Sequence, residues 1–156
     1  MKIESERLVL KTLEEKDATE EYASWLCDPE VNKYLETKTA TIDSLKEYIK
    51  EHERKDCFLL GLFSKAKHIG NIKLEVKKDM GELGIMIGNK EYWGRGFGTE
   101  AVNTLCSYAF SNLGLKEISL GVIKENERAV QTYKKAGFKV DKIDNNIIIM
   151  KKYANN

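Results

Sequence analysis

The stretch ELGIMIGNKEYWGRGFGTEAVNT, residues 82–104, decides how the rest of the chain is interpreted. A strand-like apolar run over 82–88 leads to three alternating glycines within 94–98, and a helical pattern begins at Thr99. Glycines lack Cβ atoms, so the backbone N–H groups of such a loop can point at one spot. The first turn of the following helix adds its own free N–H groups and the positive end of its dipole. This junction therefore predicts a binding site for a phosphate or pyrophosphate.

Two common phosphate motifs do not fit this loop. A P-loop requires a lysine before its final serine or threonine, but Gly98 is followed directly by Thr99. The dinucleotide motif Gly-x-Gly-x-x-Gly, counted from Gly94, would require a glycine at position 99. That motif also follows the first strand of a parallel sheet, whereas this loop follows an expected meander. A tight turn without a ligand is the alternative, and alternating glycines at a strand-to-helix junction favour phosphate binding over it.

The remaining sequence alternates between strand-like and helical periodicity. Strands are expected at 7–13, 57–64, 68–77, 82–88, 116–124, 138–143 and 147–152. Helices are expected after Asp17, through Tyr34 and Leu35, over 43–54, from Thr99 to Gly114 and over 126–136. Three consecutive strands with tight turns predict an antiparallel meander, and the βαβα units after them predict a mixed sheet. The fold class is therefore α+β, and the apolar run 147–150 predicts a strand buried on both faces.

Size and charge limit the possible functions. The 156 residues fit one domain, 1–156, because no linker, repeat or low-complexity segment divides them. The 26 basic residues nearly balance the 25 acidic ones, unlike the basic excess of a nucleic-acid-binding protein. No apolar run approaches the ~18 residues that a membrane span requires, and the first ten residues lack the apolar core of a signal peptide. We expect a cytoplasmic protein without nucleic-acid or membrane partners.

The cysteine pattern argues against a metal site. Cys27, Cys57 and Cys106 lie far apart, with no Cys-x-x-Cys pair and no histidine pattern nearby. Structural zinc sites need closely spaced ligands, so no metal is expected. An odd number of cysteines also argues against a closed set of disulfides, and reduced, mostly buried cysteines fit a cytoplasmic protein.

The run Tyr92–Ala101, YWGRGFGTEA, resembles the GNAT superfamily of N-acetyltransferases. The likeness is to the branch that contains the ribosomal-protein alanine acetyltransferases and the spermidine acetyltransferases. The pyrophosphate loop of that superfamily reads Gln/Arg-x-x-Gly-x-Gly/Ala, and Gly96 and Gly98 fill its two small positions while Trp93 stands at the first. Further segments similar to that branch are 6–10, 25–35, 126–129 and 133–138, so the resemblance covers nearly the whole chain.

This resemblance implies a specific fold and donor. The fold would be a mixed, mostly antiparallel sheet of about seven strands, flanked by helices, in which two neighbouring strands splay apart to admit CoA. The cosubstrate would be acetyl-CoA. The residues that the resemblance assigns to it are Ile85, Met86 and Ile87 for pantetheine, Gly94, Arg95, Gly96, Phe97, Gly98 and Thr99 for the pyrophosphate, Asn126 for the pantetheine arm and Lys135 for the 3′-phosphate end.

The resemblance also implies the chemistry of acetyl transfer. An amine attacks the thioester, a backbone N–H near Met86 stabilises the oxyanion, and Tyr133 protonates the departing thiolate as a general acid. Glu82 is the candidate base, with Glu75 on the neighbouring strand as a second candidate. Most carboxylates at strand ends are simply solvated, and the sequence favours that interpretation for both glutamates. Tyr133 shares a helical face with two alanines, so a structural tyrosine in the core is the alternative interpretation.

The acceptor is left open by the sequence. It would be a small-molecule or peptide amine, namely a protein N-terminus, a polyamine or an amino sugar, bound near residues 25–48, where Asp28, Glu30 and Glu36 could attract a cation. A homodimer is a further expectation from the resemblance. The competing hypotheses are a non-catalytic sensor that binds acetyl-CoA without turnover, and a nucleotide-binding enzyme that uses the same loop.

Overall fold

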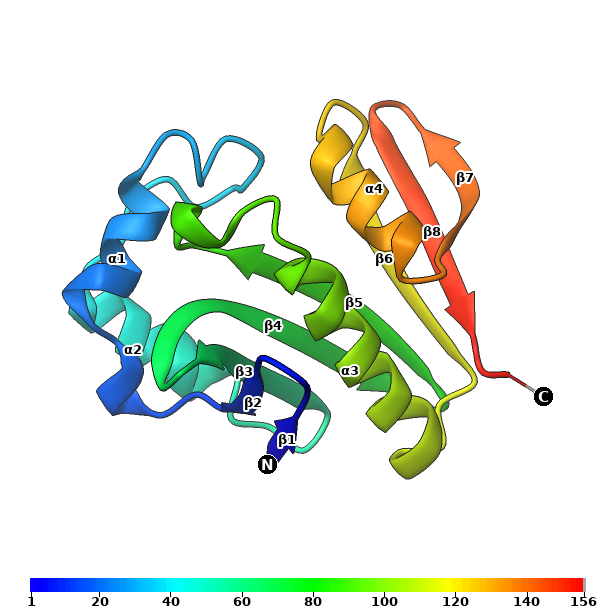
Figure 1. Ribbon diagram of the computed structural model, residues 1–156, viewed down its shortest axis with the longest axis horizontal. Coiled ribbons are helices and arrows are strands. Elements are labelled where there is room, and N and C mark those ends of the chain that lie inside the picture. Colours follow the sequence, from blue (N-terminus) through cyan, green and yellow to red (C-terminus); the bar gives the residue numbers. More distant parts are fainter. Residues whose placement is uncertain (156) are drawn as a thin grey trace.

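The computed structural model describes residues 1–155, so Asn156 of the expected domain 1–156 lies outside the described residues. Within 1–155, one eight-stranded sheet is flanked by four α-helices (Figure 1). The strands are β1 (Lys2–Glu4), β2 (Val9–Thr12), β3 (Cys57–Ser64), β4 (Lys67–Lys77), β5 (Met80–Ile87), β6 (Glu117–Ile123), β7 (Lys139–Asp144) and β8 (Ile147–Tyr153). The helices are α1 (Glu20–Cys27), α2 (Ile42–Glu51), α3 (Phe97–Asn112) and α4 (Glu127–Lys135), with short 3₁₀ turns η1 (Glu15–Asp17) and η2 (Lys90–Tyr92).

The spatial order of the strands is β1-β2-β3-β4-β5-β6-β8-β7. Every neighbouring pair is antiparallel except β5 and β6, which run parallel. The expected meander is confirmed as β3, β4 and β5. The additional strand, β1, has only three residues, too few for a recognisable alternation.

Two clusters of apolar side chains hold helices against opposite faces of the sheet. The larger cluster packs α3 and α4 onto the sheet through residues such as Leu83, Leu105 and Met150. The smaller cluster packs α1 and α2 onto the other face around Trp25 and Leu45, and it contains no residue of β6, β7 or β8. That second face is therefore uncovered over the C-terminal strands.

This uneven cover corrects the expectation for the run 147–150. Ile148 and Met150 are buried against α4, but Ile147 and Ile149 are only half-buried because no helix lies on their side. The strand is thus buried on one face only. Its unbroken apolar sequence gave no indication that its two faces differ in burial.

The parallel pair β5 and β6 separates soon after it begins. Pairing covers only Met80–Glu82 against Glu117–Ser119. Beyond that point β5 stays with β4 as far as Ile87, and β6 stays with β8 as far as Ile123. Figure 1 shows the two strands diverging, with α3 and α4 leading away from their open ends. The expected splayed pair is therefore present and positions the site described next.

The expected helix through Tyr34 and Leu35 is absent, because residues 28–41 form no helix or strand. A buried amide organises this segment instead. Asn32 Nδ2 donates to the carbonyl of Leu26 at 2.7 Å and to that of Lys38 at 3.3 Å. Such side-chain bonds to the backbone hold the chain in a loop rather than a helix.

Candidate active site

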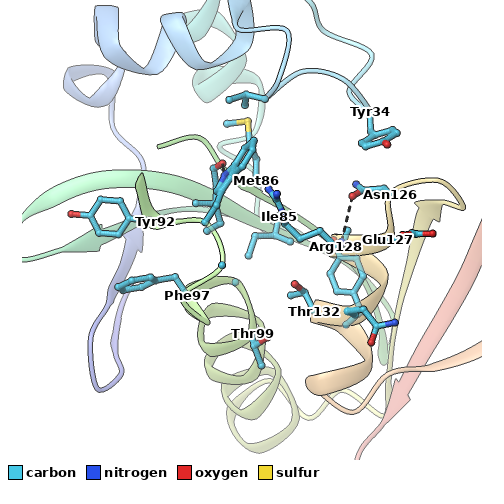
Figure 2. Close-up of a pocket in the computed structure, with 18 of the residues that line it drawn as sticks. Tyr34, Ile85, Met86, Tyr92, Phe97, Thr99, Asn126, Glu127, Arg128 and Thr132 are labelled. Carbon is cyan, nitrogen blue, oxygen red and sulfur yellow. Dashed lines mark hydrogen bonds between the residues drawn. The ribbon is translucent and has the colours of Figure 1, made fainter. Parts of the chain in front are cut away.

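A cleft of about 640 Å³ lies where β5 and β6 separate (Figure 2). Its walls come from the end of β5, the loop into α3, the first turns of α4 and the segment 28–41. Of the residues that the sequence assigned to acetyl-CoA or to catalysis, those lining the cleft are Ile85, Met86, Ile87, Gly94, Gly96, Phe97, Gly98, Thr99, Asn126, Tyr133 and Lys135. Arg95 and the two candidate bases, Glu82 and Glu75, are not among the lining residues.

The direction of the β5 backbone follows from its pairing with β4. The Gly88 N–H donates to the carbonyl of Ile69 at 2.9 Å, so this position faces β4. Backbone N–H and C=O groups alternate in direction along a strand. Those of Met86 therefore also face β4, whereas those of Ile85 and Ile87 face the gap toward β6. The N–H groups near Met86 that face the gap are thus those of Ile85 and Ile87. The side chain of Met86, by contrast, lines the cleft.

The open ends of the two strands are closed by their own loops. The indole Nε1 of Trp93 donates to the carbonyl of Ile87 at 2.7 Å. On the other strand, the N–H of Asn126 donates to the carbonyl of Ile123 at 2.8 Å. Each strand thus satisfies its last gap-facing carbonyl locally. These two carbonyls therefore do not require a bond across the gap, and the cleft stays open.

The glycine loop presents an array of free donors. Gly94 and Gly96 have φ of +70° and +81°, a region that suits glycine, and Gly96 is the N-cap of α3. Within residues 1–155, none of the six backbone N–H groups of 94–99 donates to another protein group, and the first helical bond is Glu100 N–H to the Gly96 carbonyl. Six unpaired donors at a helix N-terminus match the acceptor oxygens of a pyrophosphate.

The two arginines near this loop point in different directions. Arg95 donates from Nη1 to the carbonyl of Glu91 at 3.2 Å, and its Cζ lies 5.2 Å and 5.4 Å from the ring centroids of Tyr92 and Phe97. Its charge is therefore held behind the loop, contrary to the expected pyrophosphate contact. Arg128, which the sequence interpretation missed, lines the cleft with its Cζ 4.3 Å from the Trp93 ring centroid. Its position two residues after Asn126 was the available signal.

Helix α4 carries the remaining expected groups. Asn126 is its N-cap, and Oδ1 accepts from the N–H of Ala129 at 3.3 Å. Tyr133 is 6 % exposed, yet it lines the cleft, and burial raises the pKa of its phenol to about 12. Lys135 is exposed at the other end of the same wall. Thr132 marks the close contact with α3, because a Cβ on Gly98 would lie 3.3 Å from its methyl group.

Glu82 and Glu75 lie outside the cleft. They face each other in the β4–β5 register, in the part of β5 that is still paired with β6. Glu82 is exposed, and Glu75 contacts Lys73 at 3.3 Å and Arg54 at 3.6 Å. The structure does not bring either carboxylate together with Tyr133.

The segment 28–41 forms the side of the cleft opposite α4. The hydroxyl of Tyr34 donates to the carbonyl of Glu125 at 3.2 Å, which bridges the two walls, and Figure 2 shows Tyr34 beside Asn126. The base of the segment is held by Lys90, whose Nζ lies 2.8 Å from Asp28 and 3.2 Å from Glu30. The hydrogen bond from Lys90 lowers the pKa of the Asp28 carboxyl. Of the acidic residues expected at the acceptor site, only Glu30 lines the cleft.

A sequence model of the acetyltransferase (GNAT) domain matches residues 7–139. The chain belongs to the GNAT acetyltransferase family. The N-acetyltransferase YoaA of Bacillus subtilis is 29 % identical over 146 residues, which cover 87 % of this chain and 81 % of YoaA. The spermidine N(1)-acetyltransferase of Escherichia coli is 41 % identical over 56 residues, covering 36 % of this chain and 30 % of that enzyme.

Solved structures confirm the GNAT fold. A GNAT acetyltransferase from Bacillus anthracis superposes with a TM-score of 0.86 at 20 % identity, covering 99 % of both chains. A spermidine N-acetyltransferase from Vibrio cholerae, in complex with CoA and spermine, gives 0.83 at 23 % identity and covers 96 % of this chain and 97 % of that one.

Family membership makes this GNAT protein an acetyl-CoA-dependent acetyltransferase. Its described residues, 1–155, hold no group of three or more metal-ligating side chains. All three cysteines are free, with Cys57 and Cys106 buried and Cys27 exposed. None of the helices in the described part of the chain is long and apolar enough to span a membrane.

Proposed function

We propose that this GNAT enzyme transfers the acetyl group of acetyl-CoA directly to a primary amine while both substrates are bound. The observation that carries the proposal is the array of six free N–H groups over 94–99, at one wall of a cleft whose other wall contains Tyr133. A phosphate-binding loop and a buried phenol in one cleft suit a thioester donor with a pyrophosphate at a distance from its sulfur.

The donor would lie along the gap between the strands. Its pyrophosphate accepts from the loop N–H groups, with Arg128 supplying the charge that Arg95 does not. The pantetheine amides pair with the gap-facing N–H groups of Ile85 and Ile87 and pass Asn126. Lys135, at the exposed end of the cleft wall, contacts the 3′-phosphate.

Acetyl transfer then involves two proton transfers, one to the departing sulfur and one from the attacking amine. The amine nitrogen attacks the thioester carbonyl carbon, the C–S bond breaks, and the sulfur leaves as a thiolate. The raised pKa of Tyr133 keeps the phenol protonated at neutral pH, so it can donate to that sulfur. A thiol in water has a pKa of about 8.5, so Tyr133 first stabilises the thiolate as a hydrogen-bond donor. Desolvation in the same cleft raises the thiol pKa too and favours full proton transfer.

The other proton belongs to the amine. Because Glu82 is outside the cleft, it could accept this proton only through water. An α-amino group with a pKa of about 7.7–8.0 is partly neutral at pH 7, whereas an alkylamine at about 10.4 needs a base. The carboxylates that do line the cleft, Glu30, Glu125 and Glu127, lie at its acceptor side and attract a cationic amine.

Polyamines are therefore one acceptor class to test, and the similarity to spermidine N(1)-acetyltransferase supports their inclusion. Purified protein is incubated with acetyl-CoA and spermidine, a peptide with a free N-terminus, or an amino sugar, and CoA release is measured. We expect turnover with at least one amine and a large loss of it in Tyr133→Phe. Tight acetyl-CoA binding without turnover of any amine would instead support a binding module, and stabilisation by NAD or ATP rather than CoA would refute the proposal.

A further inference from the structure

Arg7 connects the N-terminal segment to the start of α3. Its backbone N–H donates to Glu100 Oε2 at 2.7 Å, and its Nε donates to Glu100 Oε1 at 2.7 Å. Ser5 Oγ adds a bond to Oε2 at 2.6 Å. Burial opposes ionisation of Glu100, but the bonds from Ser5 and Arg7 outweigh it and lower the pKa of the carboxyl. The carboxylate therefore stays charged and fixes the Arg7 side chain.

The same guanidinium reaches the back of the glycine loop. Arg7 Nη1 donates to the carbonyl of Arg95 at 2.9 Å, and Cζ lies 3.9 Å from the ring centroid of Phe97. In a trans peptide the carbonyl and the next N–H point in opposite directions. Holding the Arg95 carbonyl toward Arg7 therefore turns the Gly96 N–H away from it. Arg7 does not line the cleft and Gly96 does, so that N–H is directed to the cleft side.

We propose that Arg7 is a positioning residue for the donor, which sets the N–H groups of the glycine loop before the pyrophosphate arrives. The inference rests on the proposed function, because it assumes that the loop binds the pyrophosphate. Arg7 acts through the peptide that it holds and does not touch the ligand. A planar guanidinium supplies donors in fixed directions to Glu100 and to the Arg95 carbonyl, which a lysine ammonium on a flexible stem does not reproduce.

An ordinary surface ion pair on the same chain provides the matched control. Arg54 Nε lies 3.1 Å from Asp56 Oδ1, and the Arg54 side chain is 44 % exposed compared with 39 % for Arg7. Arg54 touches neither the cleft nor the glycine loop. Exposed pairs of this kind contribute little to stability, so Arg54→Gln tests the loss of an arginine without the loss of the loop contact.

The experiment measures CoA affinity by calorimetry and steady-state rates with acetyl-CoA and with S-acetylpantetheine, a donor that lacks the pyrophosphate. Arg7→Gln and Arg7→Lys are expected to raise the Kd for CoA and the KM for acetyl-CoA about 10-fold, with little change in kcat. The kcat/KM for S-acetylpantetheine should stay at the wild-type value in both variants. Arg54→Gln should behave as wild type with every ligand.

Three results would overturn the inference. Wild-type CoA affinity in Arg7→Lys would mean that only charge matters, and equal losses with both donors would mean that Arg7 merely supports the fold. Unchanged affinity in both Arg7 variants would remove the role altogether. If Arg7→Gln does not fold, Arg7→Lys decides, since it keeps the charge beside Glu100. Failure of the proposed function is distinct, because it is measured on the wild-type protein: absence of CoA binding would remove the loop assignment itself, whereas CoA binding without turnover of any amine would refute acetyl transfer and still leave the Kd comparison as a test of Arg7.

Discussion

Gly94 and Gly114 form a natural pair for testing the glycine loop. Their φ values are +70° and +69°, and a Cβ on either would meet no atom within 4 Å. An alanine held in this left-handed region costs about 1–2 kcal/mol relative to glycine. For a chain of this length that corresponds to a fall in Tm of roughly 2–8 °C. Gly94→Ala and Gly114→Ala should therefore lose similar stability.

Their effects on CoA affinity should differ. Backbone strain at Gly94 is the same before and after binding, so it cancels from the Kd, and only lost contacts with the ligand remain. The space that a Cβ on Gly94 would fill borders the cleft, where the pyrophosphate would approach the backbone. One hydrogen bond to a charged acceptor is worth about 1.5–3 kcal/mol, which is a loss of about 10- to 140-fold in affinity. Gly114 lies at the other end of α3, outside the cleft.

Thermal melts of both variants and calorimetric titrations with CoA test this reasoning. The expected result is two similar shifts in Tm, but weaker CoA binding in Gly94→Ala alone. If Gly94→Ala binds CoA as tightly as wild type, the loop does not hold the pyrophosphate at close range. If Gly114→Ala loses as much affinity, the effect is general destabilisation.

The other predictions concern Tyr133 and Glu100. Tyr133→Phe should lower kcat about 100-fold or more while the Kd for CoA changes less than about twofold, measured by turnover and calorimetry; matching losses would make Tyr133 structural. Since the pKa of Tyr133 is about 12 and its protonated form is required, the pH profile of kcat should show no alkaline loss up to pH ~10; a decline near the ordinary phenol pKa would contradict this role. The lowered pKa of Glu100 means that its contribution to stability is complete above the ordinary carboxyl pKa of ~4.3 and disappears as the pH falls through the folded value. Glu100→Gln should therefore lower Tm at pH 7, and this difference should shrink in melts below pH ~4; a constant difference would refute the linkage.

The fold was largely predictable because its strands and helices have clear periodicity. Strand β3 coincides with the expected 57–64, and the meander and the long helix after the glycines follow from local pattern alone. The segment 28–41 was not predictable in the same way. Asp28-Pro29-Glu30 is typical of the start of a short helix, but the buried amide of Asn32 makes contacts six residues away in both directions. These hydrogen bonds are tertiary contacts, and they leave no periodic pattern in the sequence.

The candidate site, like the fold, was predictable only in part. A motif can place Gly96 and Tyr133 on their elements, and these elements bring both into one cleft. It cannot say where a long side chain points, and Arg95 packs against two aromatic rings behind the loop. Nor can it give the direction of the Met86 N–H, which depends on the register between β5 and β4. A shift of one residue would have turned this N–H into the gap.

The backbone around the cleft also limits which ligand fits it. Within the described chain, Trp93 and Asn126 satisfy the terminal carbonyls of Ile87 and Ile123, while the N–H of Ile87 still faces the gap. Further down the gap, the peptide of Ile85 faces the space between the strands with no partner strand opposite. Unpaired backbone groups in a cleft lose free energy unless a ligand or water replaces the missing partner. An extended ligand with its own amides, such as pantetheine, can bind there as an added strand would. We infer that the early separation of β5 and β6 favours an amide-bearing donor arm, and that the glycine loop adds the preference for its pyrophosphate.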